Sequence, residues 1–268
     1  MIEFSKNSLN SKLRTIYFYL LKYRLIWLGL IIIILFGFCI RYLAAFDQDS
    51  MLYFSQDDFD HMAYKSGFRI SQDANVSLTS IFFDSYKDAH PPLRNILLNF
   101  LLKIINNIYL TRLASFIPGV LLIPASFLLG YSFFLNSDLR QRLYSGLVCS
   151  FLITNMETLI LLSVESRPYS LMLLFEIMAI VSLLFVVKKK INYLIIPFYI
   201  FSIFAIFTDY SALVPIAVLN SILLFYSLWD REVKVRITRV ILGSISLTLA
   251  VLFQYIQLSK FNSIHHFS

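Results

Sequence analysis

Charged residues are scarce in this chain. Only 15% of its 268 residues are Asp, Glu, Lys or Arg, whereas 58% are hydrophobic. A soluble domain carries about 25% charged residues, so the chain has too few charges to cover a water-facing surface, and we predict that it lies in a lipid bilayer. Glycine is scarce too, with 7 residues against 26 Phe and 16 Tyr, which favours aromatic packing over a bundle held by glycine contacts.

Two further absences narrow the possible functions. Cysteine occurs only at Cys39 and Cys149, both within apolar runs, so no disulfide framework is expected. The chain has no P-loop, GxGxxG or HExxH motif and therefore no recognisable nucleotide site. A reaction would need a substrate that is already activated. The net charge of +7 does not by itself indicate a nucleic-acid partner, because in a membrane protein the position of Lys and Arg matters more than their total.

Seven apolar segments could each cross a bilayer, for which about 20 residues are needed. They are residues 25–46, 112–133, 143–162, 168–187, 191–208, 211–229 and 237–258. The first is longer than the apolar core of a signal peptide and is followed by LAAFDQD, a poor cleavage site, so we expect a retained span rather than a cleaved leader. With no repeat or linker in the chain, residues 1–268 are predicted to form one all-α polytopic membrane domain.

Basic residues alternate with the predicted spans. They lie in residues 1–24, at Arg140 and Arg142, in the KKK run 188–190 and in residues 231–239. Cytoplasmic loops of membrane proteins are enriched in Lys and Arg. The pattern therefore predicts a cytoplasmic N-terminus and an external C-terminus, in the cell (inner) membrane.

This orientation makes residues 47–111 one long external loop, and the loop is acidic. It holds eight of the 16 acidic residues in the chain. Its last part, 93–110, is apolar but is interrupted at Lys103, Asn106 and Asn107, among other polar residues. An eighth span here would invert every later loop, so we predict a helix lying along the outer interface. Pro91 and Pro92 stand where that helix would begin, since a missing N–H costs nothing at that position.

The external loop contains the first candidate for chemistry, the acidic group Asp57, Asp58 and Asp60. Neighbouring carboxylates can share one proton or bind a cation, and either state suits general-base work. The alternative is a solvated acidic loop. His61 follows, but no Cys or second His stands at ligand spacing, so no transition-metal site is predicted. The binding of a divalent cation by Asp57 and Asp58 remains an alternative.

A second candidate lies at the outer surface between the third and fourth predicted spans. Glu165, Arg167 and Tyr169 occur there, and Glu176 lies about two helical turns deeper. Arginine can bind a lipid phosphate in a bidentate manner, and an ionisable residue inside a membrane is expensive and usually functional. The alternative is an internal Glu–Arg pair that only holds two spans together.

Single polar residues at the same outer level form the third candidate. Arg41 ends the first predicted span, Arg112 begins the second, and Asp209 and Tyr210 lie at the turn between the fifth and sixth. Arg41 alone would be read as a snorkelling side chain. Because all these groups are predicted at one face of the membrane, we expect a site assembled from several loops.

The order of these motifs resembles the GT-C glycosyltransferases, specifically the protein-mannosyltransferase and aminoarabinose-transferase group. That family has an arginine near the end of span one, an acidic pair, HPPL, an RLxSxxxG stretch and an SxExRxY stretch. The matching residues here are Arg41, Asp57, Asp58, His90, Pro91, Pro92, Leu93, Arg112, Leu113, Ser115, Gly119, Ser163, Glu165, Arg167 and Tyr169. The family's second acid is commonly Glu, where this chain has Asp58. Members also have additional spans, so the resemblance covers the N-terminal, catalytic half.

The resemblance implies a sugar donor carried on a polyprenyl monophosphate at the outer membrane surface. Asp57 would take a proton from the acceptor hydroxyl as that oxygen attacks the anomeric carbon, with inversion. Arg167 and Arg112 would stabilise the departing phosphate, and His90 with its prolines would position the loop. The acceptor would be a protein, a lipid or another glycan. The remaining residues expected to bind substrate or donor phosphate are Glu165, Tyr169, Arg41 and Tyr210.

Two other classes stay open. A polytopic transporter or lipid flippase would place polar groups at the bilayer midplane in broken helices, whereas here only Glu176 is predicted well inside. A non-catalytic relative acting as an assembly subunit would explain the small number of spans. The presence of both Asp57 and Arg167 argues against that reading.

Overall fold

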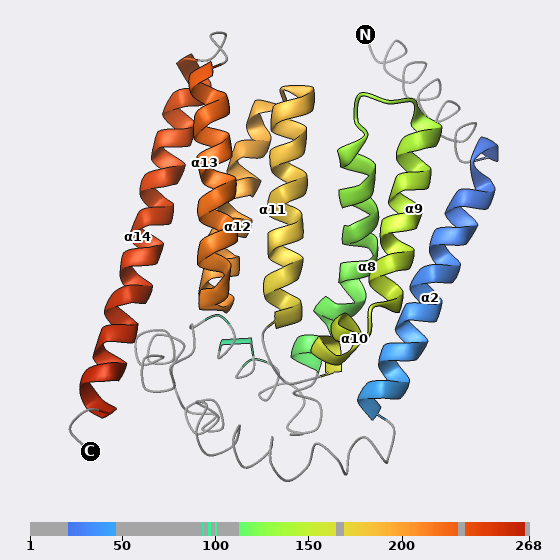
Figure 1. Ribbon diagram of the computed structural model, residues 1–268, viewed down its shortest axis with the longest axis horizontal. Coiled ribbons are helices and arrows are strands. Elements are labelled where there is room, and N and C mark those ends of the chain that lie inside the picture. Colours follow the sequence, from blue (N-terminus) through green and yellow to red (C-terminus); the bar gives the residue numbers. More distant parts are fainter. Residues whose placement is uncertain are drawn as a thin grey trace, which may run out of the picture.

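The computed structural model describes residues 21–46, 93, 96, 97, 100, 113–164, 169–229 and 234–265. These residues are helical throughout, apart from short turns, and no strand occurs among them. The α-helices are α2 (Arg24–Phe46), α8 (Leu113–Phe133), α9 (Leu139–Asn155), α10 (Glu157–Val164), α11 (Tyr169–Lys189), α12 (Ile195–Thr208), α13 (Leu213–Trp229) and α14 (Lys234–His265). Two 3₁₀ turns, η3 (Asn192–Leu194) and η4 (Tyr210–Ala212), precede α12 and α13. The long helices lie side by side in one layered bundle (Figure 1).

The prediction of an all-helical fold is confirmed for the described residues. Four helices are long and apolar enough to cross a bilayer: α2, α8, α11 and the combined segment Tyr210–Trp229. The pair α9 and α10 makes a fifth if it counts as one span. The two other predicted spans fall on shorter apolar helices, Asn192–Thr208 and Thr238–Phe253. The number of seven spans stays a prediction.

The third predicted span, 143–162, is broken rather than straight. Helix α9 ends at Asn155 and α10 begins at Glu157, with a bend of 64° between them. Met156 between them has an extended backbone, with φ −72° and ψ 110°. No proline or glycine stands at this point. The break therefore depends on contacts from other helices, which are described below.

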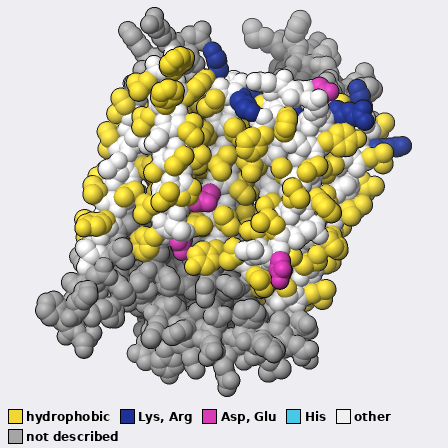
Figure 2. Space-filling view, in the orientation of Figure 1, with side chains coloured by type: hydrophobic (Ala, Val, Ile, Leu, Met, Phe, Trp, Pro, Cys, Tyr) yellow, Lys and Arg dark blue, Asp and Glu magenta, His cyan; other side chains and the backbone are white. Residues whose placement is uncertain are grey.

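Successive helices alternate in direction and divide the bundle into two ends (Figure 1). The basic end consists of the start of α2, the turn from α8 to α9, the turn after α11, the end of α13 and the start of α14. Lys and Arg side chains gather there in the space-filling view (Figure 2). The opposite end consists of the end of α2, the start of α8, α10, the start of α11 and η4. The described parts of the segments that the sequence predicts as cytoplasmic thus lie at one end.

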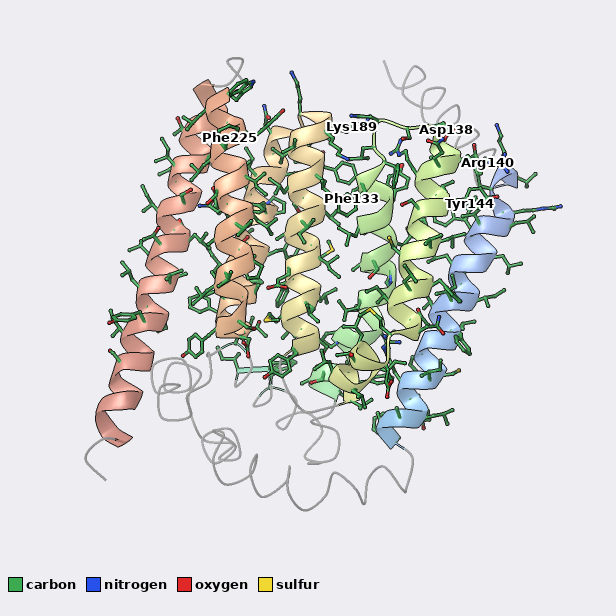
Figure 3. All side chains as sticks on the ribbon, viewed as in Figure 1. Phe133, Asp138, Arg140, Tyr144, Lys189 and Phe225 are labelled. Atoms are coloured by element: carbon green, nitrogen blue, oxygen red, sulfur yellow. The ribbon has the colours of Figure 1, made fainter. Side chains whose placement is uncertain are left out.

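The turn into α9 shows how the basic end is built. The N–H of Gln141 donates to Asp138 Oδ1 over 2.9 Å, so Asp138 caps the helix. Arg140 lies over the ring of Tyr144, 5.5 Å from its centroid (Figure 3). Arginine over an aromatic ring at the membrane boundary keeps its charge near water while its stem covers apolar surface.

Glycines lie in the contact between α8 and α9. The scarcity of glycine in the sequence predicts aromatic packing instead. A Cβ atom at Gly130 would lie 2.5 Å from the carbonyl oxygen of Ser145, and one at Gly146 would lie 2.7 Å from the Phe127 ring. Ser150 Oγ donates to the carbonyl of Ile123 over 3.0 Å. Gly130 and Gly146 each stand where the backbones of α8 and α9 approach closely.

A topology measurement tests the orientation and the interfacial helix together. Residues 93, 96, 97 and 100 are helical, and the rest of 47–111 lies outside the described residues. In a protein whose native cysteines are replaced by Ser, Ile108→Cys should react with a membrane-impermeant maleimide from outside. Lys189→Cys at the basic end is the control and should react only after permeabilisation. Labelling of position 108 from the cytoplasmic side would make 93–110 a span and overturn the predicted topology.

Candidate functional site

The structure describes three of the predicted site residues: Arg41 in α2, Tyr169 at the start of α11 and Tyr210 in η4. The other predicted site residues lie outside the described residues; they are Asp57, Asp58, His90, Arg112, Glu165 and Arg167. Described helix ends border the segments that contain them, 47–112 and 165–168. Phe46, Leu113, Val164 and Tyr169 end or begin helices at the opposite end of the bundle (Figure 1).

Arg41 is fully buried, with no exposed surface. Its Nε donates to Ser163 Oγ over 3.2 Å, one terminal nitrogen donates to the carbonyl of Gly37 over 3.3 Å, and the other donates to the carbonyl of Ile153 over 3.3 Å. The guanidinium therefore joins α2 to α9 and α10. Arg41 therefore does not snorkel to the surface, the interpretation that applied to it alone, and its predicted role in binding donor or substrate stays a prediction.

Two glycines make room for this arrangement. A Cβ atom at Gly37 would overlap Ile123 of α8, and one at Gly119 would overlap the side chain of Ser163. Ser163 in turn donates from Oγ to the carbonyl of Leu159 over 2.5 Å while accepting from Arg41. Both Gly119 and Ser163 belong to the motifs that resemble the glycosyltransferase family, so two separate motifs meet at one contact.

The start of α11 is tied to α8 in the same region. Ser170 Oγ donates to the carbonyl of Ser115 over 2.8 Å, and both serines are buried. Tyr169 packs against a core cluster that includes Met172. A smaller cluster of Ala45, Phe116 and Val164 closes the contact between α2, α8 and α10. The helix ends that flank residues 165–168 are therefore firmly placed.

A second polar group joins α11 to the turn after α12. Asp209 Oδ1 accepts from the N–H of Ser211 over 2.8 Å and from its hydroxyl over 2.7 Å. Glu176 is half-buried in α11, and its buried Oε1 has no hydrogen-bond partner among the described residues. The hydroxyl of Ser211 also lies 3.1 Å from Met172 Sδ, which connects η4 to α11. Sequence reasoning singled out Glu176, Asp209 and Tyr210 but did not predict this contact.

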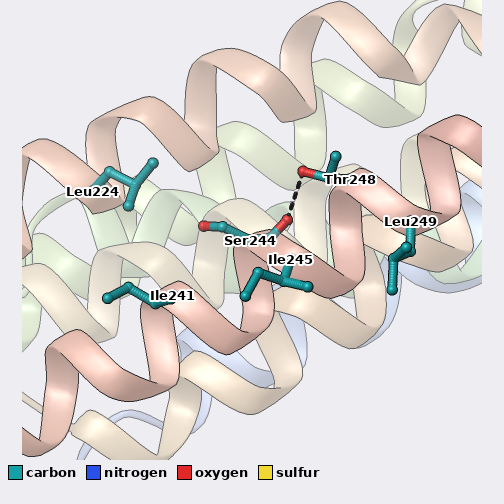
Figure 4. Close-up of a pocket in the computed structure, with 6 residues that line it drawn as sticks. All are labelled: Leu224, Ile241, Ser244, Ile245, Thr248 and Leu249. Atoms are coloured by element: carbon teal, nitrogen blue, oxygen red, sulfur yellow. Dashed lines mark hydrogen bonds between the residues drawn. The ribbon is translucent and has the colours of Figure 1, made fainter.

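Two grooves lie on the side of the bundle, away from both polar groups. One, of about 300 Å³, is lined by Leu224, Ile241, Ser244, Ile245, Thr248 and Leu249 (Figure 4). Beneath it, Tyr199 Oη lies 2.9 Å from Asn220 Oδ1, 3.0 Å from the carbonyl of Val240 and 3.2 Å from Ser244 Oγ. The other, of about 870 Å³, is lined by Val187, Ala217, Val218, Ser221, Ile222, Phe225, Tyr226 and Trp229. Both are mostly apolar, as expected for surfaces that face lipid.

A metal site is not formed by the residues that the structure describes: no group of three or more His, Cys, Asp or Glu side chains among them could hold an ion. Asp57 and Asp58 are not among those residues, so the divalent cation considered for them stays untested.

Comparisons with known proteins identify no relative. No protein-family model matches the chain, and no curated protein and no solved structure matches it either.

Proposed function

We propose that this protein is a membrane glycosyltransferase that moves a sugar from a polyprenyl-phosphate donor to an acceptor hydroxyl on the external face. The support is the position of the helix ends next to the motif residues. The described neighbours of 47–112 and of 165–168 end or begin helices at the end of the bundle opposite the basic residues. A site built from both segments would lie at the outer surface, where the headgroup of such a donor would be found.

In this proposal Asp57 is the general base, and Asp58 supports it. The acceptor oxygen loses its proton to Asp57 as it attacks the anomeric carbon, and the bond from that carbon to the phosphate oxygen breaks. Arg167 and Arg112 stabilise the charge that develops on the departing polyprenyl phosphate. His90, Glu165, Tyr169 and Tyr210 bind or orient the substrates. The donor is already activated, so no nucleotide is required, and a divalent cation at Asp57 and Asp58 would assist the same step.

The broken pair α9 and α10 favours a second candidate, a transporter. Broken helices with polar groups near the midplane line the binding sites of many transporters, and Glu176 adds a half-buried carboxyl group. The break, however, lies close to the opposite end of the bundle, and Arg41 fills it from inside the protein. Lipid binding and transfer measurements separate the two classes.

Native mass spectrometry of the purified chain, released gently from detergent, tests the proposal. The wild-type protein should carry a polyprenyl-phosphate sugar, whose mass identifies the donor. Arg167→Ala should lose that lipid, because the variant lacks the proposed phosphate ligand. Arg140→Ala at the basic end is the matched control and should keep it. If no form carries such a lipid, the chain is better described as a non-catalytic relative that works with a partner chain.

A further inference from the structure

The break between α9 and α10 leaves carbonyl groups that no helical N–H can reach. The last carbonyls of a helix have no partner within it, and a buried polar group without a partner is unfavourable. The carbonyl of Ile153 is one of these last carbonyls of α9. Arg41 donates to the carbonyl of Ile153 from the neighbouring helix. The arginine therefore completes the end of α9.

The same guanidinium holds the helix that follows the break. Its Nε donates to Ser163 in the last turn of α10, while a third nitrogen donates to Gly37 in its own helix. All three partners are neutral. The positive charge is nevertheless favoured at this place, because the C-terminal end of α9 carries a partial negative charge. Arg41 thus binds both sides of the break at once.

We propose that Arg41 is a positioning residue: it holds the bend between α9 and α10 and so sets where α10 ends and the chain continues towards α11. A planar guanidinium presents donors in fixed directions, which a lysine ammonium on a flexible stem does not reproduce. The burial of Arg41 also separates it from a phosphate ligand, since its three nitrogen atoms are engaged within the protein. Only the effect on catalysis rests on the proposed function.

Spin-label distances test this role without any substrate. One label is attached to the exposed native Cys39 in α2 and the other to Leu161→Cys in α10, in a Cys149→Ala protein. A second label pair, at Ile200→Cys in α12 and Ile245→Cys in α14, reports on the other side of the bundle. It is placed in a Cys149→Ala protein that also lacks Cys39. Arg41→Lys and Ser163→Ala should broaden the α2–α10 distance distribution and leave the α12–α14 distribution unchanged. Arg24→Lys, an exposed change in the same helix, should alter neither.

Two results would overturn the role of Arg41. An unchanged α2–α10 distribution in Arg41→Lys means that the guanidinium does not hold the bend. Equal broadening of both label pairs means that Arg41 only contributes to overall stability. Neither result depends on whether the protein transfers sugar.

Kinetics then separates positioning from ligand binding, with polyprenyl-phosphate mannose as the probe donor. For a positioning residue, Arg41→Lys should lower kcat about tenfold and leave KM for the donor within about twofold. A rise in KM at constant kcat would instead make Arg41 a donor ligand. Absence of transfer by the wild-type protein would reject the proposed function, while the spin-label result would still decide the role of Arg41.

Discussion

Sugar transfer by Asp57→Asn should fall by about 100- to 10,000-fold, the range expected when a general base is removed. Asparagine keeps the size of the side chain but cannot accept the proton of the acceptor hydroxyl. The measurement is the consumption of polyprenyl-phosphate mannose by the reconstituted protein, with a membrane extract as the source of acceptors. The amount of folded protein should not change, because Asp57 is predicted in an external loop rather than in a span.

Asp73→Asn is the matched control for this loss. Asp73 belongs to the same acidic loop, 47–111, but to none of the motifs, so its substitution should leave transfer within about twofold of the wild-type rate. Retained transfer by Asp57→Asn would remove Asp57 as the base. An equal loss in both variants would point to the total charge of the loop instead.

Gly119→Ala should lower the free energy of unfolding by about 1–3 kcal/mol, the usual cost of forcing extra atoms into a packed contact. The added Cβ would overlap Ser163 Oγ and Cβ and would lie 3.2 Å from the Ser163 Cα. Because the backbone of α10 is involved, rotation of one side chain cannot relieve the overlap. Thermal unfolding of the detergent-solubilised protein measures the change.

Gly29→Ala supplies the control for Gly119→Ala. A Cβ at Gly29 would meet only Leu147, at 3.9 Å, which is an ordinary contact. This substitution should be neutral or stabilise the helix by about 0.5–1 kcal/mol, since alanine loses less conformational freedom than glycine. Equal effects at both positions would mean that the close approach of α8 and α10 is not maintained in solution.

Much of the helical framework could be predicted from the sequence. The apolar runs 25–46, 112–133 and 168–187 correspond to α2, α8 and α11 within two residues at each end. Long apolar segments predict helices reliably, because a chain in lipid must satisfy its backbone hydrogen bonds within the protein. A helix satisfies them within one segment. The break at Met156 was not predictable in this way. No proline or glycine stands there, and the carbonyl of Ile153 before the break accepts from Arg41, 112 positions earlier in the sequence.

The candidate site, too, could be predicted from the sequence only in part. The residue types and their order predict which side chains would carry chemistry, and the alternation of basic segments predicts the end of the bundle at which they would meet; both stay predictions. The pairing of Arg41 with Ser163, and the contact of Ser211 with Met172, could not be predicted. Both contacts depend on which face each helix turns towards its neighbours. When every face of a helix is apolar, the hydropathy pattern does not predict that face.

By itself, the sequence determined that this protein is helical, lies in a membrane and keeps its basic residues on alternate connections, because composition and segment length decide how a chain distributes between water and lipid. Only the tertiary structure decided that α9 and α10 are separate helices and that Arg41 lies inside the bundle rather than at its surface. A buried charge and a broken helix are each unfavourable alone. They occur together because each satisfies the other's unpaired groups, and that pairing exists only when α2, α9 and α10 are packed.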